Sequence, residues 1–228
     1  ATQGVYDDTV RNCITKMAHI HFAATEVYKN RIIQMGENPK FVFNIGGMGA
    51  ENLKKNKNLS KFELENFLGL NLSKSTCLLT FHPETLSKIS IKEQIKPLFK
   101  ACLKFKNLNI IITSPGADPG YKTILNEIKK FTNRSSKFIF VKSLGSKKYF
   151  SILKYLDFLI GNSSSGLLEF PNLKKPTINI GKRQDGRIKA LSVIDCNNDE
   201  KSIIKAIKKA QSKNFLNKIK KTKNFYYK

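Results

Sequence analysis

The sequence predicts an α/β protein built on a parallel β-sheet that helices cover on both faces. Three observations support this fold class. From Ser75 onward, short apolar runs alternate with longer amphipathic runs, which is the order that strand–helix units produce. The short runs are mostly apolar throughout, as expected of strands buried on both faces. Polar and glycine-rich residues directly follow these runs, at the sheet edge where α/β proteins bind ligands.

The strands and helices of this domain are predicted from the length and period of each apolar run. Helical spacing is clearest where Ile95, Leu98, Phe99 and Cys102 recur on one face. Strands are expected at residues 76–81, 109–113, 138–141, 158–160, 177–180 and 193–195. Helices are expected at residues 91–106, 121–131, 148–155, 164–170 and 202–210.

The first stretch of the chain has a different organisation. Helices are predicted at Thr9–Phe22 and Ala24–Met35, followed by a strand at Phe41–Asn44 that runs into a tight loop, Gly46–Gly49. A polar linker is expected at Lys54–Lys61. These elements are too few for a complete sheet, so the stretch is interpreted as the end of a domain whose beginning is missing.

Three units are therefore predicted. Residues 1–60 would be the remnant of an N-terminal domain with its linker, and residues 61–212 a complete parallel-sheet domain. Residues 213–228 contain a further amphipathic run at 214–221. This last helix is expected to pack back toward the first domain.

The net charge of +24 is the most unusual bulk property of the chain. A charge of this sign can indicate binding to nucleic acid or to an anionic membrane. The 41 Lys and Arg residues are spread along the chain, however, and no aromatic–basic RNA-binding motif accompanies them. Solvated lysines are the preferred explanation, so neither nucleic acid nor membrane is expected as a partner. A basic binding module remains a third functional hypothesis.

Nothing in the sequence indicates a metal centre or secretion. The four cysteines are far apart without a CxxC pair, and His19 and His21 have no further ligand at metal spacing. The sequence has neither a secretory signal pattern at its start nor an apolar run of about 18 residues. A cytoplasmic protein without a metal ion is expected.

The segment Gly161-Asn162-Ser163-Ser164-Ser165-Gly166 is the strongest candidate for a phosphate site. It follows a buried strand and opens a predicted helix, whose first N–H groups lack intrahelical partners. The serine hydroxyls add donors, and the glycines allow the backbone to approach a ligand closely. A single serine would be explained as a helix N-cap, but three between two glycines favour an anion site.

Other polar residues are expected near the same sheet edge. His82 ends the first strand of the domain, where it could hydrogen-bond a diphosphate, act as an acid, or be purely structural. Glu169 could accept hydrogen bonds from sugar hydroxyls, or be a solvated helix residue. Arg183 and Arg187 could donate to a diphosphate, or be solvated in their loop.

An acidic pair, Asp7 and Asp8, stands ahead of Arg11 near the start of the chain. Paired carboxylates can divide acid and base roles between them. Carboxylates are also favoured at the N-terminus of a helix by its dipole. Both explanations fit the pair on its own.

Several segments together resemble one family, the hydrolysing UDP-N-acetylglucosamine 2-epimerases of sialic acid biosynthesis. Relatives that act on UDP-N,N'-diacetylbacillosamine, toward legionaminic acid, fit about as well. The matching segments follow the family order: GVYDDTVR (4–11), ITKMAHIHF (14–22), FHPET (81–85), GNSSSGLLE (161–169) and NIGKRQDGR (179–187).

The resemblance implies a GT-B arrangement, in which two Rossmann-like domains face each other across a cleft and UDP binds chiefly to the second. Ser163 and Ser164 would hold the diphosphate, with Ser165 and Gly166 beside them. Glu169 would bind the ribose hydroxyls. Arg183 would contact the diphosphate and Leu144 would lie near the uracil.

The resemblance also implies a reaction. His82 would assist the departure of UDP, and Asp8, followed by Arg11, would be the catalytic carboxylate in the cleft. UDP would leave C1 while the C2 proton is removed, and water would add to the resulting glycal with inversion at C2. The products would be UDP and N-acetylmannosamine or its diacetamido analogue. Neither a metal nor a redox cofactor is implied, and a homodimer is expected.

Two features depart from the family pattern. The family has Gly-Gly-Glu immediately before the point where this chain begins, and Asn12 stands where His is common. The chain is therefore expected to be N-terminally truncated, to lack at least one catalytic carboxylate, and to bind UDP with or without turnover. A GT-B glycosyltransferase is the alternative function, although the Asp8–Arg11 segment and the His82–Thr85 loop argue against it.

Overall fold

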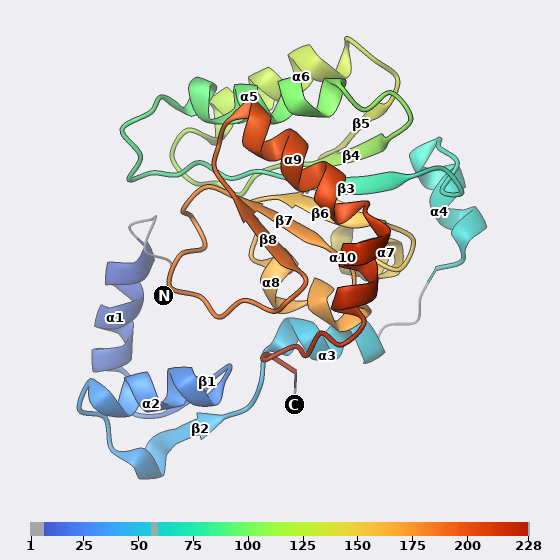
Figure 1. Cartoon of the computed structure of the whole chain (residues 1–228). Coiled ribbons are helices and arrows are strands. Elements are labelled where there is room, and N and C mark those ends of the chain that lie inside the picture. Colours follow the sequence, from blue (N-terminus) through green and yellow to red (C-terminus); the bar gives the residue numbers. More distant parts are fainter. Residues whose placement is uncertain (1–6, 56–58, 228) are drawn as a thin grey trace.

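The computed structural model describes residues 7–55 and 59–227, and its main feature is a wholly parallel six-stranded sheet (Figure 1). The sheet forms because six mostly apolar segments hydrogen-bond side by side and are buried between helices. The predicted fold class is confirmed, and every predicted strand of this domain lies within one residue of its observed bounds. The strands are Thr76–Thr80 (β3), Asn109–Thr113 (β4), Phe138–Val141 (β5), Phe158–Gly161 (β6), Thr177–Ile180 (β7) and Val193–Cys196 (β8).

The strand order β5-β4-β3-β6-β7-β8 reverses at the centre of the sheet. The chain builds outward from β3 to β5 and then returns to place β6 on the other side of β3. In the register of this central pair, Thr80 lies opposite Gly161, so both strands end at the same level. Ligands of open α/β sheets bind in the crevice beyond such a switch point.

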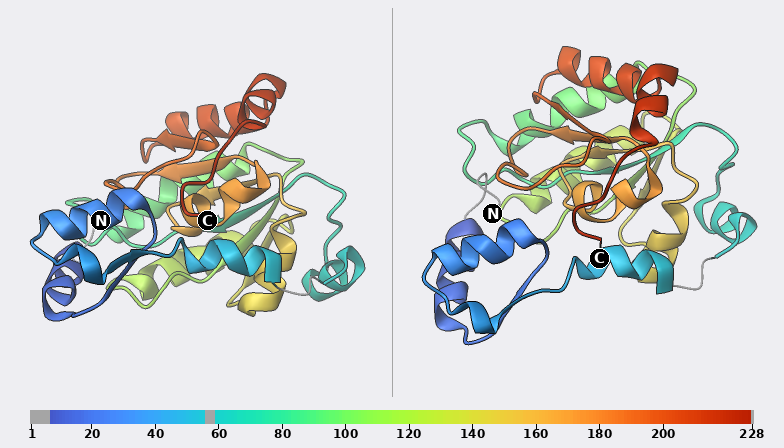
Figure 2. Two further views of the ribbon diagram at one scale, coloured as in Figure 1. Left: turned by 90° about the horizontal axis from the view of Figure 1, so that it is seen from below. Right: turned by 60° about the horizontal axis from the view of Figure 1, so that its bottom comes forward.

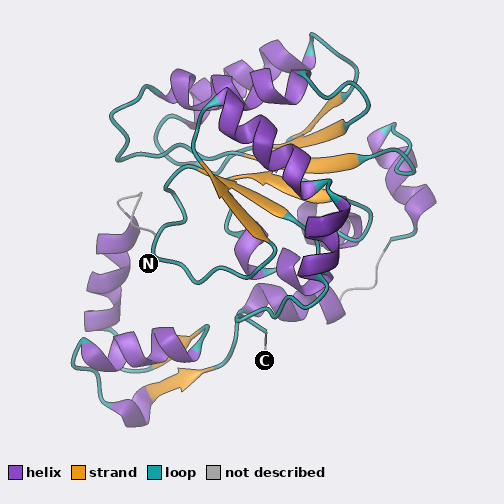
Figure 3. Cartoon of the chain, viewed as in Figure 1, coloured by secondary structure: helices purple, strands orange, loops and turns teal. Residues whose placement is uncertain are grey.

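Helices cover both faces of the large sheet (Figure 3). The side chains of β4 illustrate the division, since Ile110 and Ile112 belong to one hydrophobic core and Ile111 to the other. The first core contains residues of Ile91–Leu103 (α5), Tyr121–Thr132 (α6), Glu200–Ala210 (α9) and Lys213–Ile219 (α10). The second contains residues of Lys61–Leu68 (α4), Gly145–Ile152 (α7) and Phe170–Leu173 (η2), the last following the short helix Ser165–Leu168 (α8).

The N-terminal lobe, residues 7–55, differs from the sequence prediction in two ways. The helix expected at Thr9–Phe22 ends at Met17, and His21–Ala23 (β1) instead pairs in parallel with Val42–Asn44 (β2). Sequence periodicity missed β1 because a three-residue strand depends on a partner 21 positions away. The lobe consists of Asp7–Met17 (α1), β1, Glu26–Gln34 (α2), Pro39–Phe41 (η1), β2 and Met48–Lys55 (α3).

The segment between the two domains is more helical than expected. Met48 and Gly49, predicted to lie in a tight loop, form the first turn of α3. The predicted linker Lys54–Lys61 overlaps the end of α3 and the start of α4, and residues 56–58 lie outside the described part. Helix α4 was not predicted; its N-cap Ser60 forms a reciprocal capping box with Glu63.

The C-terminal segment connects the two parts of the molecule (Figure 2). Helix α10 itself packs on α9, because Phe215 and Ile219 belong to the first hydrophobic core. The residues after α10 reach the N-terminal lobe, where the N–H of Gly47 donates to the carbonyl of Tyr226 at 2.7 Å. No helix within residues 7–55 or 59–227 is long and apolar enough to cross a membrane.

Candidate functional site

His82 and Asn162 join the ends of the two central strands. The backbone N–H of His82 donates to Oδ1 of Asn162 at 2.7 Å, and Nδ2 of Asn162 donates to the carbonyl of His82 at 2.8 Å. Asn162 is fully buried, so the pair satisfies polar groups that water does not reach. The Asn162 amide therefore holds the serine turn, residues 161–166, at a constant position relative to His82.

Gly161 is required by the geometry at the end of β6. Its φ of +133° is rarely adopted by L-residues, and a Cβ at this position would lie 2.0 Å from the carbonyl oxygen of Thr80. Residue 161 therefore has to be glycine for β6 to lie beside β3 and then turn. This geometry gives the first glycine of the serine turn a structural role.

The serine turn has two backbone donors available for an anion. The N–H groups of Gly166 and Leu167 donate to carbonyls of the turn, and the N–H of Ser165 donates to Oγ of Ser163. The N–H groups of Ser163 and Ser164 make no hydrogen bond to a residue within the described ranges. Because α8 has only four residues, its dipole is small, so the local donors would supply most of any attraction for an anion.

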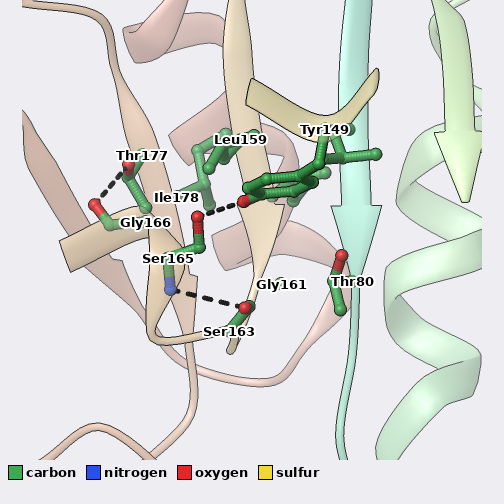
Figure 4. A pocket seen from close by; sticks show the side chains of 11 residues that line it. Thr80, Tyr149, Leu159, Gly161, Ser163, Ser165, Gly166, Thr177 and Ile178 are labelled. Atoms are coloured by element: carbon green, nitrogen blue, oxygen red, sulfur yellow. Dashed lines mark hydrogen bonds between the residues drawn. The ribbon is translucent and has the colours of Figure 1, made fainter. Parts of the chain in front are cut away.

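Tyr149 and Thr177 each hydrogen-bond the serine turn (Figure 4). The Tyr149 hydroxyl hydrogen-bonds the Ser165 hydroxyl, and Oγ1 of Thr177 donates to the carbonyl of Gly166 at 2.8 Å. The cavity that they line with Ser163 is about 10 Å³, far below the size of a nucleotide. A nucleotide would therefore have to bind outside this cavity.

Tyr149 is a site residue that the sequence did not indicate, because it is one aromatic residue on an amphipathic helix. Burial, followed by the charge of Glu169, raises the pKa of the Tyr149 hydroxyl well above its ordinary value. The hydroxyl is therefore protonated at neutral pH and remains a hydrogen-bond donor.

His82 is held in one tautomer. Its Nδ1 accepts a hydrogen bond from the N–H of Gly116 at 3.0 Å, so the neutral ring carries its proton on Nε2. Burial, followed by the positive charge of Arg183, lowers the pKa of His82 to about 4, although the Asp118 carboxylate opposes the shift. At neutral pH, His82 is thus an uncharged hydrogen-bond donor at the switch point.

Arg183 reaches the switch point from the loop after β7. Its Nη1 donates to the carbonyl of Asn162 at 3.2 Å, and its Nη2 lies 3.7 Å from Oδ2 of Asp118. The same carboxylate oxygen lies 3.6 Å from Nδ1 of His82. Oε1 of Glu84 accepts from the N–H groups of Lys182 and Arg183, which fixes the start of the loop. The predicted convergence of His82, Arg183 and the serine turn is therefore observed.

Glu169 and Arg187 lie on the side of the site that faces the N-terminal lobe. The carboxylate of Glu169 packs against α3, because a Cβ on Gly49 would lie 2.0 Å from its Oε1. Oε2 of Glu169 and Nη1 of Arg187 are both buried without a hydrogen-bond partner. Burial is the main cause that raises the pKa of Glu169 and lowers that of Arg187. Each buried polar atom left without a partner costs about 1–3 kcal/mol.

The catalytic candidates of the N-terminal lobe lie on α1. Asp8 is half-buried in its first turn, and Arg11 is exposed. Arg11 follows Asp8 by three residues, so the two lie on the same face of α1. Gly4, Val5 and Tyr6, part of the segment that resembles the family, lie outside the described residues.

Leu144 lies at the carboxyl end of β5, just before α7. Its side chain is 5% exposed and belongs to the second hydrophobic core. It also lines one side of an open cavity of about 480 Å³ with Leu59 and Lys147.

The two histidines of the N-terminal lobe do not form a metal site. Nε2 of His21 lies 3.2 Å from Oε2 of Glu37, which makes His21 a buried structural residue of β1, whereas His19 is exposed. Among the residues that the structure describes, no group of three His, Cys, Asp or Glu side chains could hold a metal ion.

The strand order and the polar site at its switch point define a Rossmann-like α/β domain. Residues 1–228 match the family model described as UDP-N-acetylglucosamine 2-epimerase, and the chain belongs to this family. The chain is 43% identical over 224 residues to the polysialic acid biosynthesis protein P7 of Escherichia coli, covering 98% of this chain and 57% of that protein.

A second relative agrees with this assignment, and two solved structures share the fold. The GDP/UDP-N,N'-diacetylbacillosamine 2-epimerase (hydrolyzing) of Campylobacter jejuni is 39% identical, over 94% of this chain and 56% of that protein. The S. aureus MnaA–UDP structure aligns with a TM-score of 0.71 at 14% identity, over 94% and 58% of the two chains. The Neisseria meningitidis UDP-GlcNAc 2-epimerase bound to UDP-GlcNAc aligns at 0.64 and 16% identity, over 93% and 58%. The chain thus spans somewhat more than half the length of these proteins and has the fold of about half of a GT-B epimerase.

Proposed function

We propose that this chain is the UDP-binding part of a hydrolysing UDP-sugar 2-epimerase. One observation carries the proposal. The available N–H groups of Ser163 and Ser164 lie at the same switch point as Arg183 and a neutral His82, which together form a set of donors for a diphosphate. The E. coli and C. jejuni relatives, named for polysialic acid biosynthesis and for hydrolysing epimerisation, support the same reaction class.

In this proposal different site residues contact different parts of the nucleotide. Ser163 and Ser164 bind the diphosphate through their N–H groups and hydroxyls, and Arg183 exchanges its contact with Asp118 for a phosphate oxygen. Glu169 accepts from the ribose, and the uracil lies at the edge of Leu144. Ser165 and Gly166 contribute indirectly, because their hydrogen bonds to Tyr149 and Thr177 hold the turn in place.

The proposed chemistry is elimination of UDP followed by hydration. A neutral His82 with its proton on Nε2 can donate a hydrogen bond to the departing diphosphate without repelling Arg183. A carboxylate must remove the C2 proton, and Asp8 with the neighbouring Arg11 is our candidate. Both N-acetylglucosamine and N,N'-diacetylbacillosamine remain candidate sugars, and a cytoplasmic homodimer belongs to the same proposal.

UDP binding by the chain itself tests the first half of the proposal. Calorimetric titration is expected to show one UDP site, and the Ser163→Ala/Ser164→Ala variant should bind about tenfold more weakly because two hydroxyl donors are lost. Ser114→Ala, outside the turn, should bind as the unaltered chain does. Salt-sensitive binding to random DNA without UDP binding would instead identify a basic binding module.

Product analysis of the full-length protein tests the second half. With UDP-GlcNAc or its diacetamido counterpart and water alone, an epimerase releases UDP and the free 2-epimeric sugar. A strict requirement for an acceptor sugar would replace the proposal with a glycosyltransferase.

A further inference from the structure

Gln184, in the loop after β7, is a fully buried side chain that contacts the serine turn. Its Nε2 donates to the carbonyl of Asn162 at 2.6 Å. Nη1 of Arg183 donates to the same carbonyl at 3.2 Å. A carbonyl oxygen has two lone pairs and can accept both bonds. Two neighbouring residues of one loop therefore bind a single backbone acceptor of the serine turn.

Stability alone does not explain a glutamine at this position. Oε1 of Gln184 is buried without a hydrogen-bond partner in the described part of the chain, which costs stability. An apolar side chain of the same size would avoid that cost, and Arg183 would still donate to the Asn162 carbonyl. The advantage of glutamine must therefore lie in the effect of its Nε2 on the serine turn.

The peptide unit between Asn162 and Ser163 connects Gln184 to the candidate anion site. This peptide is trans, so its C=O and its N–H point in opposite directions. The bond from Gln184 to the carbonyl therefore also fixes the direction of the Ser163 N–H, one of the two available donors of the turn. A donor on the carbonyl also polarises the peptide unit, which strengthens its N–H as a donor.

We propose that Gln184 is a positioning residue, which holds the Asn162–Ser163 peptide so that its N–H is directed at the diphosphate. The inference rests on the proposed UDP site, in which Arg183 turns toward a phosphate oxygen. When Arg183 turns, Gln184 remains as the donor to the buried Asn162 carbonyl, and the peptide keeps its orientation. The side chain of Asn162 cannot replace it, because both of its polar atoms are bonded to the backbone of His82.

Comparison of UDP with uridine, which lacks the diphosphate, tests the inference in the variant Gln184→Met. Methionine has about the size of glutamine but no N–H donor. The ratio of UDP affinity to uridine affinity, measured by NMR titration, should fall about tenfold in this variant, the size of one hydrogen bond to a charged group. Uridine affinity should change by less than about twofold, because the nucleoside has no group for the Ser163 N–H to bind.

Two further variants separate the loss of this donor from a general loss of packing. Gln184→Leu has a different shape but also lacks the donor, so it should give the same fall and guards against misfolding of the first variant. Thr76→Val is the matched control, because it removes a buried hydroxyl whose Oγ1 donates to the carbonyl of Lys74 at 2.8 Å. Thr76 lies at the opposite end of β3 from the site, so the affinity ratio of the unaltered chain should persist.

Three results would overturn the inference, and they are distinguishable. An affinity ratio retained in both Gln184 variants removes the role of Gln184 and leaves the UDP site intact. An equal fall in Thr76→Val also removes it, because the loss of any buried donor would then have the same effect. Absence of UDP binding in the unaltered chain removes the proposed function together with the inference.

Discussion

At the scale of single residues, burial shifts the pKa values of several groups in the candidate site. His82 is kept neutral, and Glu169 retains a buried oxygen without a partner. Both residues lie where the proposed nucleotide would bind. Such groups reduce stability in the free protein, which is a cost expected at a binding site.

His82 should contribute to the loss of stability of the chain as the pH falls. Its pKa of about 4 lies below the ordinary 6.5, so the unfolded state takes up a proton first as the pH falls. Stability from this residue is present above pH 6.5 and is lost as the pH falls toward 4, by up to about 3 kcal/mol. Urea unfolding at pH 7.5 and 4.5 should show a smaller loss in His82→Gln than in the unaltered chain. His19→Gln, at an exposed position, should retain the full loss, and equal losses in all three proteins would contradict the prediction.

The contribution of Glu169 to stability should depend on pH in the opposite sense. Its pKa is raised, chiefly by burial, so the carboxyl stabilises the fold in acid, and that stability is lost as the pH rises through its folded pKa. Glu169→Gln should therefore raise the free energy of unfolding at pH 7.5 by about 1 kcal/mol, because it removes a buried charge, one of whose oxygens has no partner. The gain should vanish in acid below pH 4, and UDP affinity should fall. A variant less stable than the unaltered chain at pH 7.5 would refute this explanation.

At the scale of elements, the serine turn depends on close contact between β6 and β3. The strands can approach only because residue 161 has no side chain, and Asn162 then joins the two strand ends. The helix that follows is one turn long, so the turn is held by hydrogen bonds from Tyr149 and Thr177 and not by a long helix.

Gly161→Ala tests this dependence. A Cβ would lie 2.0 Å from the Thr80 carbonyl oxygen in a backbone conformation that disfavours L-residues, so a destabilisation of about 3 kcal/mol or more is expected. Gly145→Ala is the matched control. It has a φ of +63° and open space around its Cβ, so only about 1 kcal/mol should be lost. Thermal unfolding of both variants measures the difference, and similar losses would show that the contact with β3 is unimportant.

Sequence periodicity predicted the elements of the large domain well because their signals are local. The apolar face of α5 and the buried runs of β3 and β4 are visible in the sequence alone. Helix α7 begins three residues earlier than predicted, at Gly145, and α8 is shorter than its apolar pattern suggested. These boundaries depend on how the chain leaves each strand, which local pattern does not specify.

At the scale of the whole molecule, the N-terminal lobe depends on the larger domain. A two-stranded sheet is marginal by itself, and several apolar side chains of the lobe remain exposed, including Ile14, Met17 and Phe22. The hydrogen bonds of Tyr28, Arg31 and Gly47 connect the lobe to the loop after β7 and to the C-terminal segment.

A double-mutant cycle tests the energetic coupling between the hydroxyls of Tyr28 and Tyr226, which lie 2.8 Å apart. Tyr28→Phe and Tyr226→Phe should each lower the free energy of unfolding by about 1 kcal/mol. The double variant should lose about 1 kcal/mol less than the sum, because both single changes break the same hydrogen bond. Tyr155→Phe combined with Tyr28→Phe should be additive. Additivity in the first pair would show that the two hydroxyls are not coupled.

By itself, the sequence determined the fold class, the six strands of the large sheet and the edge on which His82, the serine turn and Arg183 converge. These features follow from apolar period and from the order of strands along the chain. Tertiary structure alone decided that His21–Ala23 is a strand, that His82 is neutral with its proton on Nε2, and that the carboxylate of Glu169 packs against α3. The physical reason is that each of these properties depends on partners far away in the chain, whose positions no local pattern specifies.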